Sequence, residues 1–290
     1  CLYCSMTPDE YCHNKTQQSG SSFYYSFLFL DKTQSQAMTA LYAFCREVDD
    51  IVDECHEPMV AERKLQWWRE EIGALFTGKP SHPVCLALQE ALVHYPLEQR
   101  YFLELIDGMQ MDLQKHSYAN FDELSQYCYC AASTVGLLSI EIFGYQHEST
   151  REYARHLGIA LQLINILRDV REDALRGRIY IPQDELQRFK LSKENIINGT
   201  DNEQSRALFA LQAARARSYY EQAFEYLDAE DRYAQRTGII MANIYSALLD
   251  KIINTNYSVL SQRVQLTKPR KLWIAWSSAR REYKYHNKTT

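Results

Sequence analysis

Apolar residues recur at steps of three and four along nearly the whole chain, the spacing that places them on one face of a helix. The 290 residues include only 10 glycines and 7 prolines, so the chain lacks the frequent turns that small all-β folds need. The nearest approach to a strand is Arg178–Ile181, which Pro182 ends. The pattern therefore predicts one all-α domain over residues 7–282, with flexible ends at 1–6 and 283–290.

Turn residues divide this pattern into separate helices, for example at Gly78–Pro80, Phe143–Gly144 and Asn198–Thr200. Helices packed around one shared core are the expected architecture. The predicted helices span residues 7–18, 22–30, 34–54, 58–77, 82–94, 97–115, 121–143, 149–175, 203–227, 231–263 and 268–282.

The overall charge argues against a nucleic-acid-binding protein, because 32 basic and 37 acidic residues leave a net charge of −5. The eight cysteines are mostly scattered through helical stretches, which favours buried, reduced thiols and a cytoplasmic location. No apolar run reaches the roughly 18 residues that suggest a membrane span.

The predicted helix 34–54 carries an apolar stripe and, beside it, a polar one. The polar stripe places Tyr42, Arg46, Asp49 and Asp53 along one line of the helix. Asp49 and Asp53 lie about 6 Å apart along the axis, so their carboxylates repel each other unless water screens them or a cation bridges them. Taken alone, such a pair is typical of a solvated helix face.

A second polar stripe runs along the predicted helix 149–175. Its members are Gly158, Gln162, Asn165, Asp169 and Asp173. Apolar residues cover most of the remaining helix surface, which indicates that the helix is buried, and buried carboxylates need partners. A solvated face explains this stripe poorly, so we expect the two stripes to face each other across a central cavity.

Carboxylates gathered around one cavity raise one another's pKa unless cations are present. Their hard oxygen atoms favour Mg²⁺, or Mn²⁺, over zinc, and protein-bound Mg²⁺ commonly completes its coordination with water and substrate phosphate. The stripes thus predict that metal ions are bound by Asp49, Asp53, Asp169 and Asp173. These ions in turn are expected to bind a phosphorylated substrate.

Basic and hydroxyl side chains occur where a phosphate would need them. Arg46 lies within the first stripe, and Arg171 and Arg178 are among the arginines that surround the second. A guanidinium can donate two hydrogen bonds to one phosphate, although exposed arginines are also common. Ser21 and Ser22 can donate hydroxyl hydrogen bonds, and N-capping of a helix explains them equally well.

Aromatic residues are concentrated between Phe23 and Phe29 and at Tyr127 and Tyr129. Core packing explains any one of them taken singly. Together they fit a reaction through a carbocation, since aromatic faces stabilise a cation and an apolar wall excludes water.

These residues resemble the squalene/phytoene synthase family. Asp49–Asp53 looks like the first aspartate motif of the family, and Gly158–Asp173 looks like the second. Gly177–Pro182 matches the segment that follows, and Ser21–Phe23 matches an N-terminal serine-aromatic signature. The resemblance spans about residues 7 to 280 with all motifs in order. It implies a single-domain isoprenoid synthase helical bundle with a central active-site cavity.

The resemblance also implies a mechanism. Magnesium and arginine neutralise the leaving diphosphate of a prenyl donor, an acceptor double bond attacks the allylic cation, and loss of a proton closes a cyclopropane. The residues with implied catalytic roles are Tyr42, Arg46, Tyr127, Asp49 and Asp53. Those with implied substrate contacts are Ser21, Ser22, Phe23, Gln162, Asn165, Arg171, Arg178 and Tyr180.

Within the family, Ser19–Phe27, Lys64–Arg69 and Asp107–Leu113 look most like the bacterial presqualene diphosphate synthase branch of hopanoid and squalene biosynthesis. That branch implies farnesyl diphosphate as substrate, presqualene diphosphate as product, no NADPH, and downstream squalene-pathway enzymes as partners. A phytoene synthase that uses geranylgeranyl diphosphate shares every motif and is the alternative. A non-catalytic interaction protein is a remote one, because such a family member should have lost aspartates or Arg46.

The stretch 268–281 is both basic and aromatic. It is interpreted either as a peripheral contact with an anionic membrane surface, on the inner side of the membrane, or as an ordinary final helix packed on the domain.

Overall fold

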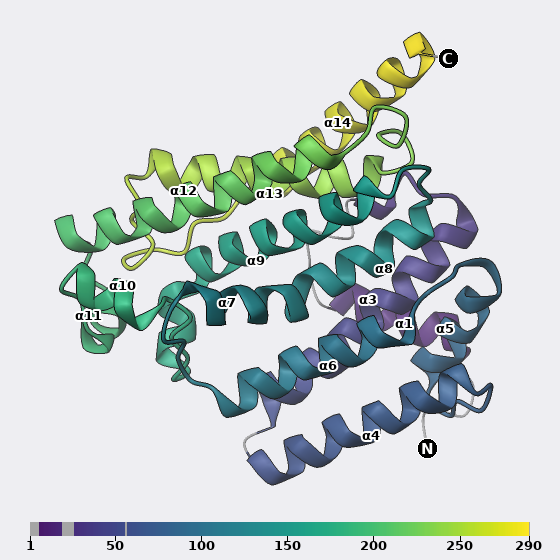
Figure 1. The fold of residues 1–290 in the computed structure, drawn as a ribbon, viewed down its shortest axis with the longest axis horizontal. Helices are drawn as coiled ribbons and strands as arrows, with labels where there is room; N and C mark the ends of the chain where they lie inside the picture. The colour runs from purple at the N-terminus through teal and green to yellow at the C-terminus, as the bar shows by residue number, and fades with distance from the viewer. Residues whose placement is uncertain (1–5, 19–25, 56, 290) are drawn as a thin grey trace.

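A computed structural model describes residues 6–18, 26–55 and 57–289, which form one bundle of helices (Figure 1). The all-α fold predicted from the sequence is confirmed. Within the described ranges, the nearest approach to a sheet is an isolated bridge between Ser117 and Ile179. The elements are α1 (Pro8–Gln18), α3 (Lys32–Glu54), α4 (Pro58–Phe76), α5 (Pro83–His94), α6 (Gln99–Gln114), α7 (Phe121–Cys128), the π-helix η1 (Tyr129–Ser133), α8 (Thr134–Phe143), α9 (Ser149–Leu175), α10 (Gln183–Arg188), α11 (Lys193–Asn198), α12 (Glu203–Tyr226), α13 (Arg236–Asn254) and α14 (Lys268–Thr289).

Local sequence signals fix where several helices begin and end. The Asp31 side chain accepts a hydrogen bond from the Gln34 backbone at 2.8 Å and caps α3. Asn202 and Ser205 form a reciprocal capping box at the start of α12. Gly144 ends α8 with a φ of 81°, a conformation that residues with a Cβ rarely adopt.

The longest helix, α9, lies in the middle of the bundle. Figure 1 shows α7 and α8 on one side of it and α12 and α13 on the other. Its buried residues include Leu157, Ile159, Leu163 and Ile166, which point to different sides of the helix. Burial on most sides is what the apolar pattern of this helix predicts, and it leaves the polar stripe facing the interior of the protein.

The π-helix η1 interrupts the predicted helix 121–143, and two glycines allow neighbouring helices to approach it closely. A Cβ on Gly108 of α6 would lie 3.0 Å from the Cβ of Cys130, and one on Gly158 of α9 would lie 2.5 Å from the Cα of Ser133. The wide turn is therefore held tightly between α6 and α9. Such turns within longer helices occur frequently at functional sites.

Other boundaries also differ from the prediction. The predicted helix 231–263 is shortened to α13, because Asn256 and Tyr257 adopt left-handed φ values of 52° and 56° just after its end. Periodicity does not predict α10 and α11, since six residues are too few to carry the signal. Helix α14 continues past residue 282, and the first four residues of the predicted helix 22–30 lie outside the described residues.

Candidate active site

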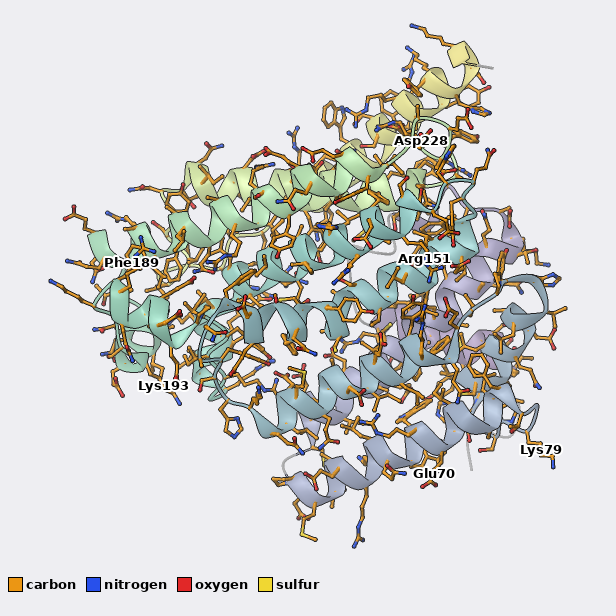
Figure 2. All side chains as sticks on the ribbon, in the orientation of Figure 1. Glu70, Lys79, Arg151, Phe189, Lys193 and Asp228 are labelled. Atoms are coloured by element: carbon orange, nitrogen blue, oxygen red, sulfur yellow. The ribbon has the colours of Figure 1, made fainter. Side chains whose placement is uncertain are left out.

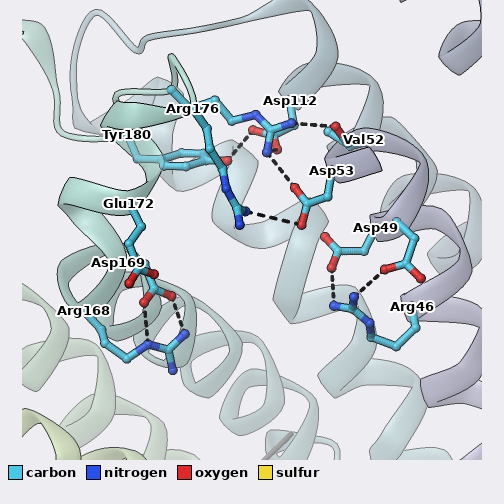
Figure 3. A network of polar contacts seen from close by, with 12 residues as sticks. Arg46, Asp49, Val52, Asp53, Asp112, Arg168, Asp169, Glu172, Arg176 and Tyr180 are labelled. Carbon is cyan, nitrogen blue, oxygen red and sulfur yellow. Dashed lines mark hydrogen bonds and ion pairs between the residues drawn. The ribbon is translucent and has the colours of Figure 1, made fainter. Parts of the chain in front are cut away.

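A cavity of about 690 Å³ lies inside the bundle, with walls from α3, α6, α8, α9 and α13. Figure 3 shows the acidic groups of α3 and those of α9 on opposite sides of the space between the two helices. The structure thus brings both polar stripes to one cavity. The stripe residues that line it are Tyr42, Arg46, Asp49, Asp53, Gly158, Gln162, Asn165, Asp169 and Asp173.

Basic partners hold the acidic residues of α3 in place. Arg46 Nη1 donates a hydrogen bond to Asp49 Oδ2 at 2.6 Å, and its other Nη atom pairs with Asp50. Asp50 also pairs with Lys15 Nζ of α1 at 2.8 Å. Asp50 is thereby tied to α1, and Arg46 is fixed on the cavity wall beside Asp49.

The Asp49 carboxyl group has an unusually high proton affinity. Burial raises its pKa to about 6, and the carboxylates of Asp53, Asp50 and Asp112 add to the rise, while Arg46 opposes it. The Asp49 side chain keeps 41% of its surface accessible, and that surface faces the cavity. A bound cation would offset both the burial and the repulsion, so this environment favours one.

The segment that follows α9 reaches back to α3 and contacts Asp53. Arg178 Nη1 donates to Asp53 Oδ1 at 2.9 Å, and Arg178 Nη2 donates to the Val52 carbonyl at 2.8 Å. Arg176 lies 3.8 Å from the other Asp53 oxygen. These contacts, drawn in Figure 3, link α3 to the end of α9 across the rim of the cavity.

Asp112 of α6 belongs to the cavity wall, although the polar stripes do not reveal it. It accepts a hydrogen bond from Tyr180 Oη at 2.6 Å and lies 3.4 Å from Arg178 Nη1. Burial raises its pKa, and Arg178 opposes the rise. The sequence does contain a signal, since Asp112 continues the buried face of Leu105 and Met109, where an acidic residue needs a partner.

The two α9 carboxylates have different surroundings. Asp169 accepts a hydrogen bond from Arg168 Nε at 2.8 Å and another from Arg263 Nε at 2.9 Å. Asp173 forms no ion pair with any residue in the described ranges. Burial raises the pKa of Asp173 to about 7, and the charges of Asp169 and Asp112 contribute to the rise. The Asp173 carboxylate is therefore the one most in need of a cation.

The donor set of this cavity fits Mg²⁺. The four aspartates of the two stripes offer hard oxygen ligands, and the raised pKa values of Asp49 and Asp173 mark a concentration of negative charge that a divalent cation would neutralise. Asn165 Oδ1 lies buried on the same wall without a hydrogen-bond partner in the described structure, so it can accept from a metal-bound water or from substrate.

Three cationic side chains line the wall beside Asp169. They come from three parts of the chain: Arg168 from α9, Arg263 from the loop after α13, and Lys271 from α14. Burial lowers the pKa of Lys271, and the charges of Arg168 and Arg263 lower it further. Like charges held this close fit a polyanion such as a diphosphate. No motif predicts Arg263 or Lys271, because only the fold brings them to α9.

Aromatic rings form another part of the wall. The rings of Tyr127 and Tyr180 stack with centroids 5.2 Å apart, and Tyr42 meets Phe27 edge to face at 6.5 Å. Burial holds the pKa of Tyr127 well above its usual range, so its phenol stays neutral. Neutral ring faces of this kind can stabilise a cation without reacting with it.

Some of the residues expected at the site do not line this cavity. Arg171 lies two positions from both Asp169 and Asp173, which puts it on the opposite side of α9. Its guanidinium packs against the turn after α11, where a Cβ on Gly199 would lie 2.6 Å from Arg171 Cζ. The segment Ser21–Phe23 lies outside the described residues. Gln162, Asn165, Arg178 and Tyr180 all line the cavity.

A separate group of potential metal ligands consists of His147, Asp228 and Glu230. These side chains are partly or fully exposed and do not line the cavity. Exposed acidic groups of this kind are common without a metal, so the group plays no part in the site described here.

Comparison with known proteins identifies this architecture. The family model of squalene/phytoene synthase matches residues 16–270. The chain belongs to the squalene/phytoene synthase family. A 15-cis-phytoene synthase of Synechocystis sp. is 34% identical, with 93% of this chain and 85% of the relative covered. Another, from Synechococcus elongatus, is 36% identical, with 91% of this chain and 89% of the relative covered.

Solved squalene/phytoene synthase structures share the fold. A crystal structure of a dehydrosqualene synthase with ligand gives a TM-score of 0.85 at 27% identity and covers 96% of this chain and 97% of its own. The squalene synthase HpnC from Alicyclobacillus acidocaldarius gives a TM-score of 0.76 at 28% identity and covers 86% of this chain and 94% of its own. The expected family is confirmed, and with it head-to-head prenyl condensation as the class of reaction.

Proposed function

We propose that this member of the squalene/phytoene synthase family condenses two geranylgeranyl diphosphates to 15-cis-phytoene. The observation that carries the proposal is the identity of 34% and 36% to two 15-cis-phytoene synthases, against 27% and 28% to the dehydrosqualene and squalene synthases. Sequence segments taken alone favour the presqualene diphosphate branch, so the proposal revises that expectation in favour of its alternative.

In this proposal the diphosphates bind between the acidic and basic walls of the cavity. Asp49, Asp53, Asp169 and Asp173 would hold Mg²⁺, which when bound supplies positive charge to the leaving diphosphate. Arg46, Arg263 and Lys271 line the same space and donate to phosphate oxygens. As the C1–O bond of the donor breaks, the diphosphate leaves with the electron pair and an allylic cation remains.

The apolar and aromatic walls govern the fate of that cation. The 2,3 double bond of the acceptor attacks donor C1, and loss of a proton closes a cyclopropane. Departure of the second diphosphate, rearrangement of the ring and loss of another proton then give phytoene. Tyr127 and Tyr180 present stacked rings to the cation and exclude water. None of these steps transfers a hydride to the carbon chain, so no NADPH is required.

A second candidate is synthesis of presqualene diphosphate from two farnesyl diphosphates. The TM-score of 0.85 to the dehydrosqualene synthase supports it, as does the resemblance of Lys64–Arg69 and Asp107–Leu113 to that branch. The two reactions share the first condensation. They differ in the length of the prenyl tail and in whether the second diphosphate leaves and the cyclopropane rearranges.

Incubation of the purified protein with either diphosphate and Mg²⁺, without NADPH, tests the proposal when the extracted product is identified by mass spectrometry. We expect phytoene from geranylgeranyl diphosphate, loss of product with Asp49→Asn, and normal product with Glu62→Gln, which changes an exposed carboxylate of α4. Presqualene diphosphate from farnesyl diphosphate, with no phytoene, would move the protein to the second candidate. Failure with both substrates would count against either reaction.

We also propose that α14 holds the enzyme at an anionic membrane surface on the cytoplasmic side, where apolar substrate and product gather. No helix within the described ranges has the length and apolarity that crossing a bilayer requires. Ile274 and Ala275 of α14 pack on α13, whereas Trp273 and Trp276 are 55% and 52% exposed. The helix is rich in lysine and arginine, which suits anionic lipid.

A further inference from the structure

Polar groups that the proposed reaction does not use line the cavity far from the aspartates. Tyr153, Gln235 and Thr237 are exposed over only 1%, 0% and 2% of their surfaces. Tyr153 precedes Asp169 by 16 positions on α9, which separates them by about 24 Å along the axis. Figure 2 places Arg151, which lies two positions before Tyr153 near the start of α9, across the bundle from Phe189, which follows α10.

One polar atom of each of these three side chains has no hydrogen-bond partner in the described structure. They are Tyr153 Oη, Gln235 Oε1 and Thr237 Oγ1. Gln235 is held in place because its Nε2 donates to the Gly144 carbonyl at 2.8 Å. Tyr153 Oη lies at the first turn of α13, where a Cβ on Gly238 would be 3.1 Å away. The three atoms therefore gather at the start of α13, where helical N–H groups also lack intrahelical partners.

The cavity wall between these atoms and Gln162, which precedes the aspartates on α9, is apolar. Leu157 and Leu161 continue along α9, and Met241 and Ile244 continue along α13. A prenyl tail that extends from the diphosphate site along α9 passes these side chains before it reaches Tyr153. A tail long enough to cover the three polar atoms would exclude water from them and offer no hydrogen bond in return, which is unfavourable.

We propose that Tyr153, Gln235 and Thr237 form a hydrated stop that sets the longest prenyl tail the cavity accepts. Water held by several polar atoms in a buried site is costly to remove, so the tail ends where the water begins. The inference rests on the proposed function for the twenty-carbon length of the natural tail. It adds to that function the residues that set the limit.

Binding of unreactive thio-analogues with tails of fifteen, twenty and twenty-five carbons, measured by calorimetry with Mg²⁺, tests the stop without turnover. We expect wild-type protein to bind the twenty-five-carbon analogue at least about tenfold more weakly than the twenty-carbon one. The variant Tyr153→Phe/Thr237→Val keeps the shape and removes two polar atoms, so we expect it to reduce this difference by about tenfold. The control Tyr220→Phe removes a hydroxyl that lies 3.4 Å from Asn243 and does not line the cavity.

A second variant keeps the test decisive if the first does not fold. Gly238→Ala places a methyl group against Tyr153 Oη and shortens the cavity, so we expect weaker binding of the twenty-carbon relative to the fifteen-carbon analogue by about tenfold. Gly73→Ala, with no atom within 4 Å of the new Cβ, is its control.

The outcomes separate the stop from the proposed function. Equal wild-type binding of the twenty- and twenty-five-carbon analogues, or an unchanged preference in folded variants, overturns the stop. If wild-type protein prefers fifteen carbons to twenty, the proposed function fails. The stop then holds only if Tyr153→Phe/Thr237→Val raises relative binding of the twenty-carbon analogue.

Discussion

Arg178 and Asp53, 125 positions apart in the sequence, meet at 2.9 Å across the rim of the cavity. Arg178 thus holds a carboxylate that is expected to bind metal. The same guanidinium lies 3.4 Å from Asp112, so Arg178 can stay paired with Asp112 when it releases Asp53. A metal ion and Arg178 therefore compete for the Asp53 carboxylate. Both can bind a diphosphate at the same time, because both are positively charged.

The first prediction follows from this competition. We expect Arg178→Gln to bind Mn²⁺ more tightly than wild type in the absence of substrate, because Asp53 loses its internal partner. The KM for the prenyl diphosphate should rise by about tenfold or more, since a charged hydrogen bond to phosphate is lost. Titration calorimetry and steady-state kinetics check the two effects. Arg188→Gln on the exposed end of α10 is the control, and weaker metal binding by Arg178→Gln would refute the competition.

The second prediction concerns the buried hydrogen bond of 2.6 Å from Tyr180 to Asp112. Single and double variants with Asp112→Asn and Tyr180→Phe should show a coupling free energy of about 1.5–3 kcal/mol, because the acceptor carries a charge. Urea unfolding of the four proteins measures it. Strictly additive effects would mean that the hydrogen bond contributes nothing to stability.

The third prediction is a pH dependence of metal stabilisation. Burial raises the pKa of Asp49 to about 6 and that of Asp173 to about 7, so between about pH 4 and pH 7 the folded, metal-free protein holds protons that the unfolded chain has released. These two groups therefore make the metal-free protein less stable as the pH rises through that window. Above it both carboxylates are ionised, and Mg²⁺ binds without competition from protons.

Thermal unfolding with and without Mg²⁺ measures this effect. We expect Mg²⁺ to raise the Tm more at about pH 8 than at about pH 5.5, and saturation at a hundred times Kd to add about 2.7 kcal/mol. The double variant Asp49→Asn/Asp173→Asn should lose most of the pH dependence. An equal Mg²⁺ effect at both pH values in wild type would contradict the assignment of these carboxylates as ligands.

The fourth prediction tests the close contact at η1. Gly158→Ala should destabilise the protein by about 1–3 kcal/mol, because its Cβ would lie 2.5 Å from the backbone of Ser133. Gly73→Ala in the last turn of α4 meets nothing within 4 Å and should stabilise by up to about 0.5–1 kcal/mol. Denaturant unfolding of both variants measures the sign of each change in the free energy of unfolding. A neutral Gly158→Ala would show that η1 moves away from α9 easily.

The fifth prediction concerns the exposed face of α14. Wild-type protein should sediment with vesicles that contain anionic lipid, and less so as salt is added. Trp273→Ser/Trp276→Ser should reduce binding by about tenfold or more, because two exposed indole rings are lost. Trp67→Ser removes an exposed ring of α4 and serves as the control. Binding that survives the α14 change would place the contact elsewhere.

Sequence reasoning predicts much of this site because two of its helices carry their information locally. Helix α9 is apolar on most sides and therefore buried, so exposure to solvent does not explain the polar stripe of Asp169 and Asp173. The helical spacing also places Arg171 on the other side of α9 from that stripe, since two positions rotate a side chain by about 200°. The expected substrate contact of Arg171 does not take this rotation into account.

The remaining wall depends on tertiary structure. Arg263 and Lys271 lie on a loop and on α14, whose paths no local pattern fixes. They reach the cavity wall only when α13 and α14 dock. The π-helix η1 escapes prediction for a different reason. The wider turn of a π-helix leaves no mark in the apolar pattern of its own segment. The glycines that make room for it, Gly108 and Gly158, lie on other helices.

The position of Tyr153 and Asp169 on one uninterrupted helix restricts how this protein can evolve. A single inserted or deleted residue between them would rotate one relative to the other by about 100° and carry either the carboxylates or the hydroxyl away from the cavity. The length of the cavity can therefore change through side-chain substitutions, but not through insertions or deletions in α9. In homologous genes, length variation should accumulate in the loops that flank this helix and be absent within it.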